Sequence, residues 1–166
     1  MTDSIISFFQ ESSMLTKEAI TFVISMLPII ELRGAIPVGV ALGIESWKLY
    51  IIAVLGNMLP IPFVLLLARP IINFCLNSRI LKKFGKWLEN KVDKNSDKII
   101  KYGTWGLMIF VAVPLPGTGA WTGALIAAIL DLRIKKAVPS ILLGVMIAGI
   151  IMLFGSNIVK FIIGLF

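Results

Sequence analysis

Long apolar stretches, separated by short polar ones, dominate the pattern of this chain. Four of them run over residues 19–44, 49–68, 105–130 and 137–154. A helix rises about 1.5 Å per residue, so 49–68 and 137–154 are each long enough to cross the roughly 30 Å hydrocarbon layer of a membrane once. The pattern therefore predicts an all-α integral membrane protein that contains two simple transmembrane helices.

The other two stretches are too long for one span and are interrupted in the middle. The first interruption runs from Pro28 to Pro37, and the second contains Pro114, Pro116 and Gly117. Proline lacks an amide hydrogen and disfavours helix at the residue before it. The pieces on either side are about half a bilayer long. We therefore expect each stretch to form a re-entrant helical hairpin that enters and leaves on one side of the membrane.

Non-helical backbone inside a membrane must be buried in protein or line a wet cavity, because lipid cannot satisfy its polar groups. The simplest arrangement is that the two breaks pack against each other. The small-residue patterns at 39–43 and 119–123, both GxxxG, would allow close helix approach there.

The two halves of the chain also resemble each other. A shift of 86 residues places Pro28 on Pro114 and Glu45 on Asp131. Each half then reads as a broken hairpin, a short polar turn and a single span, which is the order found in transporters built from internal repeats. We expect a single membrane domain (1–166) with repeat 1 at 19–76, a basic amphipathic cytoplasmic linker at 78–101 and repeat 2 at 102–166.

The distribution of basic residues predicts the orientation. Of the 16 Lys and Arg residues, eight lie in 78–101 and three in 131–136, whereas the first 18 residues carry one. Because Lys and Arg favour cytoplasmic loops, these two segments should lie inside and the N-terminus outside. With re-entrant hairpins, this orientation makes the two repeats inverted.

Composition excludes several kinds of chemistry. The chain is 58% hydrophobic and 15% charged, has no histidine, and has Cys75 as its single cysteine. Histidine-based catalysis, histidine metal sites and an internal disulfide are therefore excluded. No Walker-type glycine loop is present either. We expect a protein that is not an enzyme and uses no cofactor or metal.

Glu31 and Arg33 are the charged residues that lie well inside an apolar stretch. An ionisable group at mid-membrane costs roughly 2.5–3.5 kcal/mol, which makes both of them functional candidates. In one interpretation Arg33 contacts an anionic group, and Glu31 acts as its counter-ion or as a proton carrier. In the other, the two residues form a structural ion pair at the hairpin tip.

The second break is uncharged, and its prolines and glycines free the backbone. Thr118 is expected to cap the helix that follows, whose N-terminal amides could bind an anion or be satisfied by the opposite hairpin or by water. Asn57 either lines the same cavity or links two helices, and Trp121 either closes the pocket or packs. The predicted substrate site comprises Glu31, Arg33, Gly34, Pro37, Asn57, Pro116, Gly117, Thr118, Gly119 and Trp121.

At 31–37 (ELRGAIP) and 114–123 (PLPGTGAWTG) the chain resembles the small multidrug export protein family of bacterial and archaeal membranes. That family is similar to the DedA (VTT-domain) superfamily, which includes undecaprenyl phosphate transporters and lipid scramblases. The resemblance implies facing re-entrant hairpins, a place in the inner membrane and a lipid-phosphate or amphiphilic substrate. DedA proteins carry arginines around the second break, whereas 111–123 is uncharged here.

Our leading expectation is a transporter or flippase that moves an anionic amphiphile, such as a polyprenyl phosphate, past the hairpin tips. The alternative is a proton-coupled multidrug exporter in which Glu31 binds small cations. From a different class comes a membrane scaffold that transports nothing. Because four membrane elements form a thin wall, we also expect a homodimer, with membrane lipids and no nucleic acid among its partners.

Overall fold

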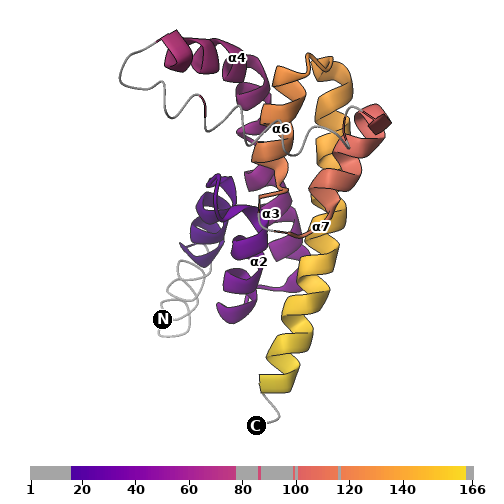
Figure 1. Cartoon of the computed structure of the whole chain (residues 1–166). Coiled ribbons are helices and arrows are strands. Elements are labelled where there is room, and N and C mark those ends of the chain that lie inside the picture. The colour runs from indigo at the N-terminus through magenta and orange to yellow at the C-terminus, as the bar shows by residue number, and fades with distance from the viewer. Residues whose placement is uncertain (1–15, 78–85, 87–98, 100, 116, 164–166) are drawn as a thin grey trace. The chain divides into compact units, whose positions relative to one another are not determined.

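The computed structural model describes residues 16–77, 86, 99, 101–115 and 117–163, and within this part of the chain the regular secondary structure is all α-helical (Figure 1). This confirms that the fold is all-α. Most of the predicted linker at 78–101 falls outside the described residues, so its amphipathic character stays a prediction.

The first apolar stretch is broken, as the prolines predict. Residues 16–26 are helical, 27–30 form a turn around Pro28, and α2 follows over Glu31–Ala41 (Figure 1). With 11 residues, α2 is about 17 Å long, roughly half the hydrocarbon layer. Pro37 lies inside α2, so the irregular backbone ends at residue 30 and does not extend to Pro37 as expected. An internal proline removes one helical hydrogen bond, and this short helix tolerates that loss.

A tight turn connects α2 to the first long apolar helix. Gly43, with a φ of 76°, follows the end of α2, and the next helices are α3 (Ser46–Met58) and α4 (Ile61–Asn77). Residues 46–68 form an apolar helical segment of 23 residues, about 34 Å long and therefore long enough to cross a membrane. The first predicted simple span agrees with this segment.

The second half has the same order of elements. Residues 101–112 are helical, 113–119 contain the second break, and α6 covers Ala120–Ile129. The last helix, α7, runs over Ile134–Ile163 and includes an apolar segment of 29 residues at 134–162. This segment agrees with the second predicted span.

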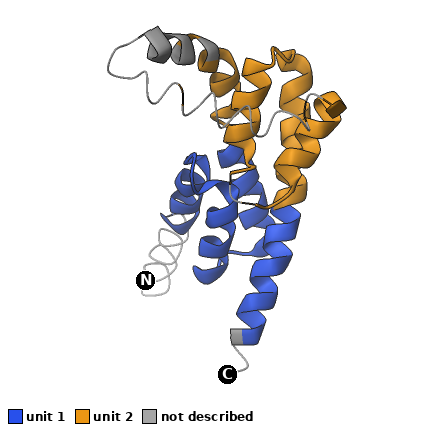
Figure 2. Ribbon diagram, in the orientation of Figure 1, with its two compact units in different colours: residues 1–57, 149–166 blue, residues 58–148 orange. Residues whose placement is uncertain are grey.

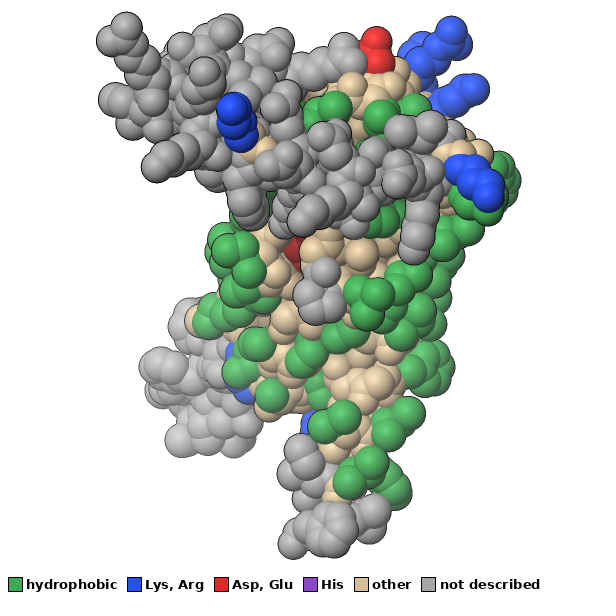
Figure 3. All heavy atoms as spheres, in the orientation of Figure 1, with side chains coloured by type: hydrophobic (Ala, Val, Ile, Leu, Met, Phe, Trp, Pro, Cys, Tyr) green, Lys and Arg blue, Asp and Glu red, His purple; other side chains and the backbone are tan. Residues whose placement is uncertain are grey.

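The surfaces of the two long helices suit a lipid environment. In the most apolar part of each, a third of the residues are buried, so the remaining apolar side chains face outward. Hydrophobic side chains accordingly spread over much of the described surface in Figure 3. An apolar surface of this extent is rare on a water-soluble monomer and marks a membrane or protein interface.

Hydrogen bonds at the end of α2 recur 88 residues later at the end of α6. The amides of Gly43 and Ile44 donate to Val40 O and Gly39 O, at 3.2 and 3.0 Å. In the second half the amides of Asp131 and Leu132 donate to Ala128 O and Ala127 O, at 3.3 and 2.9 Å. Asp131, with a φ of 59°, therefore matches Gly43, and not Glu45 as a uniform shift of 86 suggests. The distance in sequence between equivalent residues is 86 at the first prolines and 88 at these turns, because the second break (113–119) is longer than the first (27–30).

The chain divides into two compact units, 1–57 with 149–166 and 58–148 (Figure 2). In the first unit, glycines bring helices close together. A Cβ on Gly56 of α3 would come within 2.7 Å of Phe22 O, and one on Gly149 of α7 within 2.9 Å of the Tyr50 ring. A Cβ on Gly39 would overlap Leu49. Of the two glycines in the 39–43 pattern, Gly39 therefore allows close packing against Leu49, whereas Gly43 adopts the positive φ of the turn.

In the second unit, α4 packs on α6, and two glycines contact the helical residues 101–112. A Cβ on Gly144 of α7 would lie 2.7 Å from Met108 O and 2.7 Å from Val111 Cβ. A Cβ on Gly123 of α6 would lie 2.7 Å from the same valine's Cγ2. The contact of Gly144 with Met108 O repeats that of Gly56 with Phe22 O, at offsets of 88 and 86.

Candidate functional site

Glu31 is a buried acid in an unusual backbone conformation. It begins α2, its exposed fraction is 4%, and its φ of 52° lies in the left-handed region. Its amide donates to Leu27 O at 2.9 Å across the turn. A residue with a side chain costs roughly 1–2 kcal/mol in this region, and such strain concentrates at functional sites. Both properties distinguish Glu31 from an ordinary first residue of a helix.

Arg33 lies two residues further along α2 and is partly buried. The negative charge of Glu31 acts on its guanidinium through a Coulombic interaction. On a regular helix, residues two apart point in different directions. The left-handed backbone at Glu31 breaks this regularity at the start of α2. The predicted ion pair between the two side chains stays a prediction.

Gly34 and Pro37 have packing roles on the same helix. A Cβ on Gly34 would overlap the side chain of Ile30, so glycine permits the tight approach of the turn to α2. Pro37 is exposed and lines a groove beside α7.

Asn57 is fully buried near the end of α3. Within the described part of the chain, neither its Nδ2 nor its Oδ1 has a hydrogen-bond partner. An amide that links two helices would form such a bond, so the structure does not support the linking interpretation. A buried polar group without a partner is costly, and it calls for an explanation such as a water or a ligand.

The second break differs from its expectation at Thr118. The single O–H of Thr118 is shared between Val113 O at 2.7 Å and Leu115 O at 2.9 Å, and the N-cap of α6 is Gly119. The expected cap at Thr118 is wrong, because Thr118 lies one residue before the capping position and its hydroxyl reaches carbonyls at the end of the preceding helix. Gly117 has a φ of 85° and is exposed, while Pro116 lies outside the described residues.

Gly119 and Trp121 complete the predicted site. Gly119 is buried, and its carbonyl accepts a hydrogen bond from the Gly123 amide at 2.8 Å. Trp121 lies in the first turn of α6 and is half-buried. The first break belongs to one compact unit and the second to the other (Figure 2), so a shared pocket between them stays a prediction.

Sequence reasoning missed two buried hydroxyls near the first break. Ser25 donates to Phe22 O at 2.7 Å and Thr21 to Lys17 O at 3.0 Å. These bonds satisfy both hydroxyls within their own helix, which is how Ser and Thr are usually accommodated in apolar helices. Their spacing along the helix could have predicted this arrangement.

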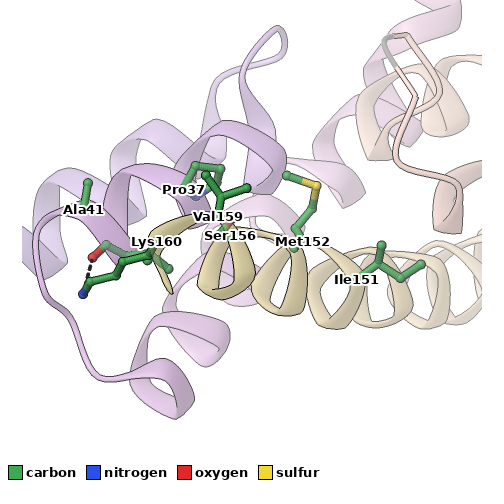
Figure 4. Close-up of a pocket in the computed structure, with 9 residues that line it drawn as sticks. Pro37, Ala41, Ile151, Met152, Ser156, Val159 and Lys160 are labelled. Atoms are coloured by element: carbon green, nitrogen blue, oxygen red, sulfur yellow. Dashed lines mark hydrogen bonds between the residues drawn. The ribbon is translucent and has the colours of Figure 1, made fainter. Parts of the chain in front are cut away.

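Sequence reasoning also missed the groove between α2 and α7. Its volume is about 720 Å³, and Lys160 lies on its rim with Nζ 3.4 Å from Val40 O (Figure 4). A lone cation near the end of a long apolar helix was the available signal.

Comparison with known proteins gives one match. A family model with the description "Putative small multi-drug export protein" matches residues 31–151, which is more than half of the chain and includes both breaks. No curated protein and no solved structure matches the chain. The further relationship to the DedA superfamily therefore stays an expectation.

Proposed function

The chain belongs to the small multi-drug export family, and from this premise we propose that it exports small amphiphilic cations across a membrane in exchange for protons. The family description favours this function over the flippase that was our leading expectation. The matched region lacks charge at its second break, which also favours an exporter over a carrier of lipid phosphate.

The observation that carries the proposal is the position of Glu31. It follows Pro28 by three residues, as Gly117 follows Pro114, and both residues have positive φ, 52° and 85°. Glycine is the residue that adopts this conformation without strain. A buried glutamate at such a position is strained, and strain of this kind concentrates at functional sites, which supports a functional role for its carboxylate.

Glu31 would couple the two fluxes by binding either a proton or a cation. A carboxylate buried in apolar surroundings must be compensated, because an isolated buried charge is very costly. A proton would neutralise the Glu31 carboxylate in one direction of transport, and the cationic substrate would neutralise it in the other. Exchange would follow from competition, since one carboxylate can bind the proton or the cation but not both at once.

Arg33 would act as the resting counter-ion of Glu31. Its guanidinium interacts with the Glu31 charge, and its partial exposure leaves it a route to water when a ligand replaces it. In this proposal Arg33 lowers the free energy of the state in which Glu31 binds neither a proton nor the substrate. Arg33 itself does not bind the substrate.

The path across the membrane would be built from two inverted repeats. The helices that follow the two breaks, α2 and α6, are each about half a bilayer long, which suits re-entrant hairpins that enter from opposite faces. The recurrence of the turn hydrogen bonds at 43–44 and 131–132 supports a common ancestry of the halves. Rocking of one repeat against the other would give alternating access, and a second copy of the chain would complete the wall of the path.

The test is ethidium efflux from vesicles that contain the purified chain and a proton gradient. Glu31→Gln should reduce the efflux rate at least about tenfold, whereas Glu45→Gln, at an exposed acid in the turn after α2, should leave it unchanged. Full activity of Glu31→Gln would overturn the proposal. Movement of an anionic lipid that is lost in Arg33→Ala would favour the flippase, and no transport of any kind would favour the scaffold.

A further inference from the structure

The groove between α2 and α7 combines an apolar wall with one positive charge. Pro37 and Val40 of α2 face Ile151, Met152 and other small or apolar residues of α7 across it. Among the described residues that line the groove, Lys160 is the charged one. We infer that this groove binds one anionic phospholipid, with an acyl chain along the groove and the phosphate on Lys160.

The order of residues along α7 matches the order of groups in such a lipid. Figure 4 shows Ile151 and Met152 at one end of the row and Lys160 at the other. The nine helical steps from Ile151 to Lys160 correspond to about 13 Å of helix. Because Lys160 lies near the end of an apolar segment that is long enough to cross the membrane, its ammonium falls at headgroup depth. The rest of the groove then lies at the depth of the acyl chains.

Lys160 has binding capacity left for a phosphate. Its ammonium donates to Val40 O over 3.4 Å, a long bond that uses one of its three N–H groups. The side chain is exposed, so the remaining donors are accessible from the headgroup layer. Lipid phosphate is the anion present at this depth, which is the reason to choose a lipid over a soluble ligand.

Gly155 gives the groove its depth. A Cβ on this glycine would meet no atom within 4 Å, whereas the glycines that pack helices together have neighbours well inside that distance. The space above Gly155 is therefore open to a ligand. Because the Cβ of a side chain at this position displaces no protein atom and points into open space, a large residue here provides a variant that should block the groove and still fold.

The experiment is native mass spectrometry of the full chain in detergent, titrated with phosphatidylglycerol or phosphatidylcholine. The unsubstituted chain should retain one phosphatidylglycerol at concentrations where phosphatidylcholine is lost. Lys160→Gln should weaken phosphatidylglycerol retention about fivefold, equivalent to ~1 kcal/mol, and Lys135→Gln at the other end of α7 should not. Gly155→Phe should abolish retention, whereas Gly155→Ala should preserve it.

Several outcomes would overturn the inference. These are equal retention of the two lipids, unchanged retention in Lys160→Gln, and unchanged retention in Gly155→Phe. A dimer that dissociates in Gly155→Phe without any lipid effect would assign the groove to a second copy of the chain. Glu31→Gln should leave lipid retention intact, so that failure of the export proposal and failure of this one are separate results.

Discussion

Glu31 and Gly117 share two features, since each lies three residues after the first proline of its break and each has left-handed backbone. In the second half the position is filled by the residue that is least strained there. In the first half it is filled by a buried acid. This difference allows the structural and functional effects of Glu31 to be separated.

We predict that Glu31→Gly stabilises the chain and abolishes export. Glycine relieves the strain of a φ of 52°, so the free energy of unfolding should rise by about 1 kcal/mol. Unfolding in mixed micelles and ethidium efflux should be measured on the same preparation. A less stable chain would show that Glu31 has a structural role. A chain that still exports would show that export does not need the Glu31 carboxylate.

We predict that Gly56→Ala and Gly144→Ala destabilise the chain to similar extents. Each new methyl group would press on a backbone carbonyl, Phe22 O or Met108 O, at 2.7 Å. Overpacking of this kind costs about 1–3 kcal/mol. Gly155→Ala is the matched control, because its methyl group meets open space and alanine favours helix. Equal stability of all three variants would contradict the prediction.

The turns after α2 and α6 provide a test of the equivalence of the halves. Gly43→Ala should lower the free energy of unfolding by about 1 kcal/mol, because it adds a Cβ at a positive φ. Asp131→Ala should lower it by a smaller amount, because Asp131 already carries a Cβ and aspartate tolerates this conformation better than alanine. Asp131→Gly should be neutral or stabilising. Glu45→Ala, in the same turn as Gly43, serves as the control and should have little effect. A neutral Asp131→Ala would mean that the second turn does not need this conformation.

Asn57→Leu should stabilise the chain. The change removes a buried amide that has no hydrogen-bond partner in the described part of the chain, which should raise the free energy of unfolding by about 1–3 kcal/mol. Asn157→Leu is the control, since Asn157 is exposed and already donates to Leu153 O at 2.9 Å. A loss of stability in Asn57→Leu would indicate that the amide has a partner such as a bound water.

The positions of the helix breaks were predictable because they depend on proline chemistry. Pro28 and the prolines from 114 onward remove helical hydrogen bonds locally, and the structure breaks near both. The extent of the first break was not predictable in the same way. Pro37 is chemically able to end a helix, but α2 continues through it. A proline restricts the backbone, and the surrounding packing decides whether the helix survives.

The candidate site was predictable in its charges and not in its geometry. Glu31 and Arg33 stand out in the sequence because a charge inside an apolar stretch is costly. The positive φ of Glu31 has no sequence signal, since glutamate is rarely found in that conformation. The orientation of the Thr118 hydroxyl was also unpredictable, because it depends on which carbonyls the end of the preceding helix leaves nearby.

Val111 lies between Gly123 of α6 and Gly144 of α7, close enough on both sides that neither glycine could carry a side chain without displacing something. Val111 cannot move along one of these helices without first losing its contact with the other. Any conformational cycle in this part of the molecule should therefore carry these three helices together as a lever, with bending confined to the connecting turns. A cross-link between two of these three helices would leave such a cycle intact, whereas a cross-link between one of them and another part of the protein would stop it.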